Sequence, residues 1–163
     1  MNIKIKKGGY LICGNFRVRC AIGKTGINRD KHEGDGSTPK GKFSLGKLYY
    51  RKDRIKKVLT TFKKKIITKN MGWSDSVNSK LYNKEISLNS KEKGEKLFRI
   101  DHKYDLLLVI NYNKNPIIKD KGSAIFIHLS KNHKPTKGCI AVYKKDFIKL
   151  LKLINIKSKI IIN

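Results

Sequence analysis

The sequence predicts a mainly β protein with one helix near its C-terminus. Three observations support this prediction: short apolar runs separated by turn residues, a Gly-Asn pair between two strand-like segments, and one segment with the periodicity of an amphipathic helix. The chain has 163 residues, which suits one domain, and it shows no internal repeat and no linker. We therefore expect residues 1–163 to form a single domain.

The first expected element is a β-hairpin over residues 9–22. Its two strands flank Gly14 and Asn15, a pair suited to a two-residue turn. This turn would set Cys13 opposite Phe16 across the hairpin.

The strands that follow are expected from short apolar runs. A glycine-rich loop over residues 23–41 comes first, and residues 51–70 show no clear pattern. Residues 71–102 are polar and look like a long, partly ordered excursion, the kind of segment that often forms a lid or binding loop. Further strands are expected at 43–50, 104–112, 123–129, 140–142 and 159–162.

The helix is expected over about residues 144–153. Phe147, Leu150, Leu151 and Ile154 recur at the spacing that forms one apolar face.

The charge of the chain is strongly positive. Lys and Arg number 39 and Asp and Glu number 12, so the formal net charge is +27. Either the excess is compositional, or it attracts an anionic wall polymer, a membrane surface or nucleic acid. Because the basic residues are spread along the chain rather than gathered in a patch, we expect no specific nucleic-acid binding.

The cysteines do not fit a disulfide framework or a zinc site. Cys13 and Cys20 are not cross-strand partners in the expected hairpin and lack the close spacing of zinc ligands. Because the total of three is odd, at least one thiol must be free of intramolecular disulfides, and Cys139 is the candidate for that free thiol. We expect neither a metal nor an organic cofactor.

The chemistry of the chain is expected at a histidine and a cysteine on neighbouring strands. His128 lies in an apolar strand, and a polar loop connects it to Gly138 and Cys139 at the start of the next strand. An imidazole beside a thiol can take its proton and return it to a leaving group. Lys137 would favour the thiolate, and the backbone around Gly138 could bind a developing oxyanion.

A structural explanation competes with the catalytic one. Cys139 could be an inert core residue, and His128 could be a satisfied polar residue in a strand. His133, in the loop between them, is the competing base, although we expect it to face solvent. His32 and His102 lie far away in sequence and are expected on the surface.

Three motifs in the right order resemble the L,D-transpeptidase (YkuD-type) catalytic domain family. His128 followed by Thr136-Lys-Gly-Cys139 is similar to the His…Ser/Thr-x-Gly-Cys signature of that family. The segment 36–43, Gly-Ser-Thr-Pro-Lys-Gly-Lys-Phe, is similar to its Thr-Pro-x-Gly-x-Phe element. Residues 122–129, 72–75 and 82–83 also resemble a bacterial subgroup of the family, and the similarity covers roughly residues 9–153.

The resemblance implies a β-sandwich-like catalytic domain of mixed sheets, acting as a monomer on peptidoglycan stem peptides. Cys139 would be the acylated nucleophile, His128 the general base and acid, and the Gly138 backbone part of the oxyanion hole. An amine acceptor would make the enzyme a transpeptidase, and water would make it a carboxypeptidase or hydrolase. A third possibility is a basic protein that binds nucleic acid or an anionic polymer.

Other residues of the motifs are expected to bind substrate. The substrate groove would be lined by Trp73, Asp75, Tyr82, Asn83, Thr136 and Lys137. For Trp73 the alternative is that it anchors a long loop on the core. Asp101 and Tyr104 are weaker candidates of the same kind.

Two features depart from the family pattern. Many members carry Arg two residues after the cysteine, where this chain has Ala141, and Lys137 or Arg99 could supply the missing charge. The family implies a location in the periplasm or cell envelope, but residues 1–9 are basic without an apolar core behind them. We therefore expect no signal peptide in this chain, which leaves the cytoplasm and another export route open. No stretch is apolar enough to cross a membrane.

Overall fold

The computed structural model describes residues 1–89, 91 and 93–163. Its strands are β1 (Ile3–Lys6), β2 (Tyr10–Cys13), β3 (Phe16–Arg19), β4 (Ile27–Asn28), β5 (Thr38–Pro39), β6 (Gly41–Tyr50), β7 (Lys64–Ile66), β8 (Met71–Trp73), β9 (Glu85–Ser87), β10 (Glu95–Lys96), β11 (Leu106–Ile110), β12 (Phe126–Leu129), β13 (Ile140–Val142) and β14 (Lys159–Ile162). The α-helix of the described residues is α1 (Lys144–Leu153).

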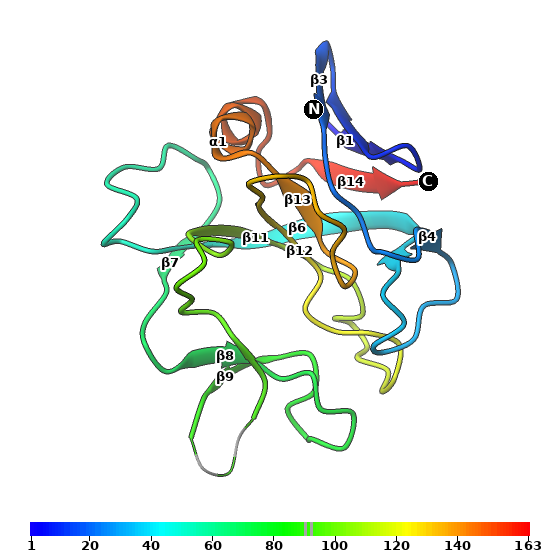
Figure 1. The fold of residues 1–163 in the computed structure, drawn as a ribbon, viewed down its shortest axis with the longest axis vertical. Coiled ribbons are helices and arrows are strands. Elements are labelled where there is room, and N and C mark those ends of the chain that lie inside the picture. Colours follow the sequence, from blue (N-terminus) through cyan, green and yellow to red (C-terminus); the bar gives the residue numbers. More distant parts are fainter. Residues whose placement is uncertain (90, 92) are drawn as a thin grey trace.

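A large mixed sheet forms the centre of the molecule, in the strand order β13-β12-β11-β6-β14-β1-β2-β3 (Figure 1). The long strand β6 joins its two halves, because residues 41–44 pair with β14 and residues 45–50 pair with β11. The strands β12 and β13 run parallel, whereas β11 is antiparallel to both of its neighbours. The expected mainly β fold with mixed sheets and a C-terminal helix is confirmed.

Both faces of β11 and β12 are buried, which explains why every residue of these strands except His128 is apolar. On one face, Leu106, Leu108 and Ile127 join the core beneath α1. On the other face, Leu107 and Phe126 belong to a second apolar cluster. Alternation along the strands therefore assigns each residue to one of two cores.

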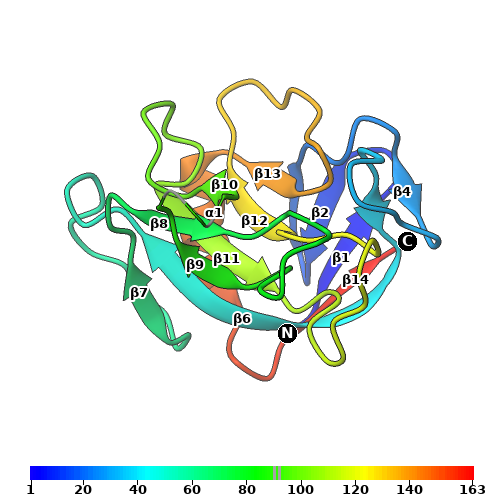
Figure 2. The ribbon, with the colours of Figure 1, turned by 90° about the horizontal axis from the view of Figure 1, so that it is seen from below.

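The second cluster is covered by a small sheet in the order β10-β8-β9, on the side of the large sheet away from α1 (Figures 1 and 2). Trp73 on β8 packs edge-on against Phe126 and Tyr49, with ring centroids 5.1 and 6.3 Å away. The segment expected as a loose excursion thus has a sheet of its own. The central strand β8 is buried throughout, and exposed residues lie on β9 and β10.

Most expected elements agree with the structure, and the differences lie in the loops. The hairpin turns at Gly14 with Cys13 paired to Phe16, and the helix and last strand have the expected bounds. The glycine-rich loop contains the short parallel pair β4 and β5, and residues 51–70 contain β7. All three cysteines are free, as expected from the odd count and the hairpin register.

Candidate active site

The register of β12 and β13 places His128 and Cys139 on one face of the sheet. His128 pairs with Ala141, and Cys139 lies two residues before Ala141, so alternation turns all three side chains the same way. The Phe126 N–H approaches Cys139 Sγ at 3.4 Å, which confirms that the sulfur lies over the start of β12. Phe126 and His128 are successive positions on that face, so the two candidate groups are neighbours on the sheet.

The sulfur of Cys139 is held by backbone groups on both sides. Its thiol donates to the Ala124 carbonyl oxygen at 3.1 Å, and it accepts from the Phe126 N–H. Cys139 is 8% exposed. Burial raises the pKa of this thiol, and the negative charge of Glu95 adds to the increase, whereas the Phe126 N–H and the Lys31 charge oppose it. The Cys139 thiol is therefore neutral at neutral pH.

The imidazole of His128 is fixed in one tautomer. Its Nδ1 lies 2.9 Å from the Leu129 carbonyl oxygen, and because a carbonyl only accepts, Nδ1 carries the proton. Nε2 is then left with a lone pair that can accept a proton. Burial lowers the pKa of His128 to about 4, so the ring is neutral and able to act as a base at neutral pH. The Tyr104 ring packs edge-on against it, with centroids 5.2 Å apart.

The turn before Cys139 depends on Gly138. Its φ is +142°, and a Cβ there would lie 2.7 Å from the Ser37 carbonyl oxygen. Thr136 Oγ1 donates to the Cys139 carbonyl oxygen at 2.6 Å and accepts from the Gly138 N–H at 3.1 Å. Glycine is thus required by both conformation and space, and the Thr136 hydroxyl closes the turn.

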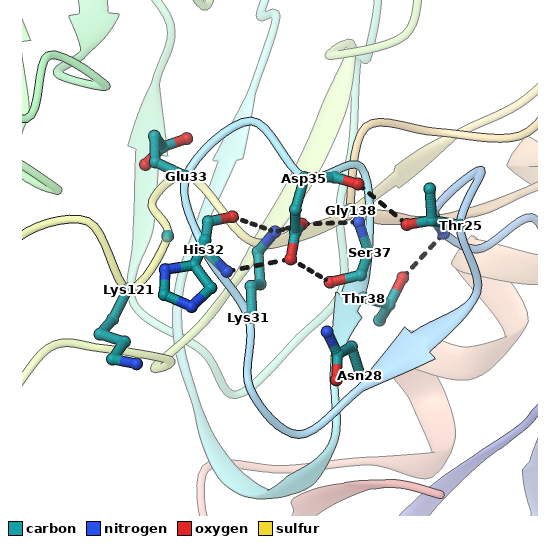
Figure 3. A network of polar contacts seen from close by, with 12 residues as sticks. Thr25, Asn28, Lys31, His32, Glu33, Asp35, Ser37, Thr38, Lys121 and Gly138 are labelled. Carbon is teal, nitrogen blue, oxygen red and sulfur yellow. Dashed lines mark hydrogen bonds and ion pairs between the residues drawn. The ribbon is translucent and has the colours of Figure 1, made fainter.

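A buried ion pair supports this turn from behind (Figure 3). Lys31, which is 2% exposed, donates to Asp35 at 2.7 Å, and a Cβ on Gly138 would lie 3.4 Å from its Nζ. The Ser37 N–H and hydroxyl also donate to Asp35. Burial alone would raise the pKa of Asp35, but these donors together with Lys31 and His32 hold it far below its usual value. The neutral pair therefore holds the Lys31 ammonium group in a fixed place behind Gly138.

Three of the six residues expected to bind substrate are buried in the support of the site. Trp73, Tyr82 and Asn83 are between 2 and 3% exposed. The Trp73 indole N–H donates to Asn83 Oδ1 at 3.0 Å, and the Ala124 N–H donates to the same oxygen at 3.2 Å. Asn83 thus fixes the Ala124 peptide, whose carbonyl accepts the Cys139 thiol.

The other three, Asp75, Thr136 and Lys137, line a cleft of about 1540 Å³ together with His128 and Cys139. Asp75 and Lys137 are exposed, and Thr136 is half-buried. The remaining walls come from the loop between β4 and β5, from β10 and the loop between it and β11, and from the loop that follows β12. Ala141 also lines this cleft.

The remaining histidines have other contacts, and one of them, His102, also lines the cleft. The His133 ring packs on Tyr143, with centroids 4.1 Å apart, and His133 is half-buried rather than exposed as expected. His32 and His102 are exposed, as expected, and contact Asp120 and Asp105 respectively.

The sequence patterns did not identify Glu95 or Lys31 as parts of the site. Glu95 lines the cleft and accepts a hydrogen bond from the Tyr104 hydroxyl at 2.5 Å. In sequence each is one charged residue among many. Lys31 could have been noticed only through its spacing of four residues from Asp35.

A family model for the YkuD L,D-transpeptidase catalytic domain matches residues 5–162. The chain therefore belongs to the L,D-transpeptidase catalytic domain family. Proteins with this domain are typically enzymes of the cell envelope. Among curated proteins, none matches the chain.

Two solved structures of one protein show the same fold at low sequence identity. The helical cell shape determining protein Pgp2 from Campylobacter jejuni has a TM-score of 0.51 and 15% identity, over 99% of this chain and 46% of that one. A mutant of Pgp2 has a TM-score of 0.50 and 14% identity with the same coverage. Bd1075 from Bdellovibrio bacteriovorus has a TM-score of 0.49 and 18% identity, over 99% and 47%. The chain thus spans less than half the length of these proteins.

Within the described residues, no helix has the length and apolar character needed to cross a bilayer. The same part of the chain contains no cluster of three or more His, Cys, Asp or Glu side chains arranged to hold a metal ion.

Proposed function

We propose that this protein is an L,D-transpeptidase that acts on peptidoglycan stem peptides through an acyl-enzyme on Cys139. One observation carries the proposal: the Cys139 sulfur and the His128 ring lie on the same cleft-facing side of β12 and β13. The bond from Nδ1 to the Leu129 carbonyl supports the role of His128, because it leaves Nε2 ready to accept the thiol proton.

The reaction begins from the neutral pair. As the substrate displaces the thiol from the Ala124 carbonyl, the proton passes to His128 Nε2 and the sulfur attacks the L,D-peptide carbonyl. The C–N bond then breaks, and His128 returns the proton to the departing D-residue amine. The acceptor amine attacks the thioester, its C–N bond forms as the C–S bond breaks, and Cys139 regains a proton.

The backbone at Gly138 and Cys139 provides the oxyanion donor in this proposal. Because the Gly138 N–H is engaged by Thr136, we assign the role to the Cys139 N–H and treat Gly138 as the residue that shapes the turn. Asp75, Thr136 and Lys137 are the proposed substrate contacts. Lys137 also supplies the positive charge missing at Ala141, since the alternative, Arg99, is already paired with Asp101 at 2.6 Å.

The test is mass spectrometry of the protein and products after incubation with muropeptides that carry tetrapeptide stems. A mass increase on the Cys139 peptide and new cross-linked muropeptides are expected. Shortened stems without cross-links would instead identify a carboxypeptidase on the same nucleophile. The absence of any adduct or product with folded protein would contradict both.

A further inference from the structure

The half of the large sheet formed by β3, β2, β1, β14 and the start of β6 has one apolar face and one basic face. Its apolar face, with Ile3, Leu11 and Ile160, belongs to the core beneath α1. Alternation turns the intervening residues of these strands to the opposite face. On β11 and β12 that opposite face is covered by the second apolar cluster, but this cluster includes no residue of β1, β2, β3 or β14. In this half of the sheet the opposite face is therefore open to solvent, and Lys4 and Lys6 on it are exposed.

Six cations gather on this open face, which we call the basic face. They are Lys4 and Lys6 on β1, Arg17 and Arg19 on β3, Lys42 on β6 and Lys159 on β14. The four strands and residues 41–44 contain no Asp or Glu. Among the described residues, none of the six cations forms an ion pair within 4.0 Å. By contrast, Arg51, Arg54 and Arg99 are each paired with an aspartate.

The fold builds most of the basic face from the two parts of the sequence that contain no acidic residue. Residues 1–29 and 147–163 contain seven and four Lys and Arg residues respectively, and all 12 acidic residues lie between them. The parallel pairing of β1 with β14 brings these two segments together. Basic residues that are spread along the sequence are therefore gathered in space.

Apolar side chains alternate with the cations across the basic face. In one cross-strand row the register aligns, from strand to strand, Lys42, Ile161, Lys4, Ile12 and Arg17. In the next row Tyr10 lies between Lys6 and Arg19, and the guanidinium groups of Arg17 and Arg19 lie 4.4 and 5.0 Å from the centre of its ring. Cations within a row are two strands apart, or about 10 Å, so salt screens much of their mutual repulsion.

We propose that the basic face docks the protein on the surface of a membrane rich in anionic phospholipids. The cations spread over five strands, which suits a two-dimensional array of phosphates better than a single polymer chain. Ile12 and Ile161 lie between the cations, where they can enter the boundary between headgroups and acyl chains. A soluble polyanion would leave both isoleucines without a partner. Single-stranded nucleic acid would favour free aromatic rings, but Tyr10 is already covered by two arginines.

The docking surface is separate from the candidate active site. None of its six cations lines the cleft that contains His128 and Cys139. Contact with a membrane through this face therefore uses no residue of the cleft, and the inference does not depend on the proposed function.

The first test uses the wild-type chain and sedimentation with lipid vesicles at about 0.15 M salt. One set of vesicles contains equal parts of phosphatidylcholine and phosphatidylglycerol, and the other contains phosphatidylcholine alone. Binding to the anionic vesicles should be at least about 100-fold tighter, because each basic residue near an anionic surface contributes roughly 5-fold. Equal binding to both kinds of vesicle would overturn the proposal.

The second test removes charge from the basic face. Lys4→Gln, Lys6→Gln and Lys42→Gln together should weaken binding to the anionic vesicles by about 100-fold. Turnover of muropeptides should stay unchanged, so a failure of the docking surface is distinguishable from a failure of the proposed function. A triple variant that folds, as judged by thermal unfolding, and binds like the wild type would contradict the proposal.

The matched control removes the same number of charges elsewhere. Lys56→Gln, Lys57→Gln and Lys63→Gln change three exposed residues between β6 and β7, a segment at the other end of the large sheet from β1 (Figures 1 and 2). This variant should bind within about 3-fold of the wild type, because distant charges are screened. Equal losses in the two triple variants would show that net charge drives binding, and would overturn the proposal.

A third variant separates a membrane from a soluble polyanion. Ile12→Ser combined with Ile161→Ser leaves the charge unchanged and should weaken vesicle binding by about 10-fold. The same variant should bind soluble polyphosphate and duplex DNA like the wild type. If vesicle binding did not respond to this change while polyphosphate or DNA bound more tightly than the vesicles, the partner would be a soluble polyanion and the membrane proposal would be wrong.

Discussion

The N-terminal hairpin and the turn before β13 both bury cysteines next to glycine turns, yet their surroundings differ. Cys13, Cys20 and Cys139 are 1%, 4% and 8% exposed. Burial raises the pKa of all three thiols, to about 12 for Cys20. Neither burial nor a shifted pKa therefore separates a reactive cysteine from a structural one in this protein.

The difference lies in what surrounds each sulfur. Cys13 and Cys20 belong to the large apolar core, and β1, β2 and β3 around them contain no histidine. Cys139 has a carbonyl and an N–H on its sulfur, His128 on the same sheet face and a cleft beside it. Polar neighbours and access mark the candidate nucleophile, and each of the following predictions tests that distinction.

Replacing the cysteines one at a time should have the largest effect. Cys139→Ala should lower turnover of tetrapeptide stems by more than about 10³-fold, because the acyl-enzyme cannot form. Cys13→Ala and Cys20→Ala should remain active, since each loses only a small buried group. Chromatographic assay of muropeptides measures all three, and appreciable turnover by Cys139→Ala would refute the mechanism.

Loss of the proposed base should lower turnover slightly less than loss of the proposed nucleophile. His128→Gln should lower turnover by roughly 10²–10⁴-fold, the usual contribution of general acid–base catalysis. His133→Gln is the control and should stay close to wild type, because that ring packs on Tyr143. If the two variants behaved in the opposite way, His133 would be the base.

The site should also limit stability in acid, in a way the hairpin does not. The pKa of His128 is about 4 in the folded protein and about 6.5 when unfolded. Above pH 6.5 the ring is neutral in both states, so burying it costs no stability there. Below pH 6.5 the unfolded state takes up a proton that the folded state accepts only near pH 4. The free energy of unfolding therefore falls as the pH decreases from 6.5 to 4. Between pH 7 and pH 4 this should amount to roughly 3 kcal/mol of unfolding free energy. Urea unfolding at several pH values should show that the free energy of unfolding falls less steeply with decreasing pH in His128→Gln than in the wild type. Equal slopes in the two proteins would contradict the burial of a neutral ring.

The two glycine turns should tolerate alanine differently. At Gly138 a Cβ would meet the Ser37 carbonyl at 2.7 Å, whereas at Gly14 it would meet the flexible end of Met1 at the same distance. Both glycines have positive φ, so an alanine at either position would be strained by the backbone conformation. Gly138→Ala should cost about 2–3 kcal/mol and most activity, and Gly14→Ala about 1 kcal/mol without loss of turnover. Thermal unfolding and activity assays of the two variants measure these effects, and equal losses in both would contradict the prediction.

Local patterns allowed much of the fold to be predicted. The helix followed from the spacing of Phe147, Leu150 and Leu151, and the hairpin followed from Gly14 and Asn15, because both are short-range effects. The sheet β8–β10 was missed because its strands have only two or three residues each. Such short strands exist only because the Trp73 side chain packs on the large sheet.

The sequence by itself determined the order of the motifs and the placement of His128 and Cys139 at neighbouring strands. Alternation along β12 then assigned both to one face, since the period of a strand is a local property. Only the tertiary structure decided which charges surround them. Lys31 and Glu95 come from segments far apart in the chain, and the effect of a charge on a thiol depends on distance and burial. Sequence spacing contains neither quantity, so the electrostatics of the cleft became visible only when the chain was folded.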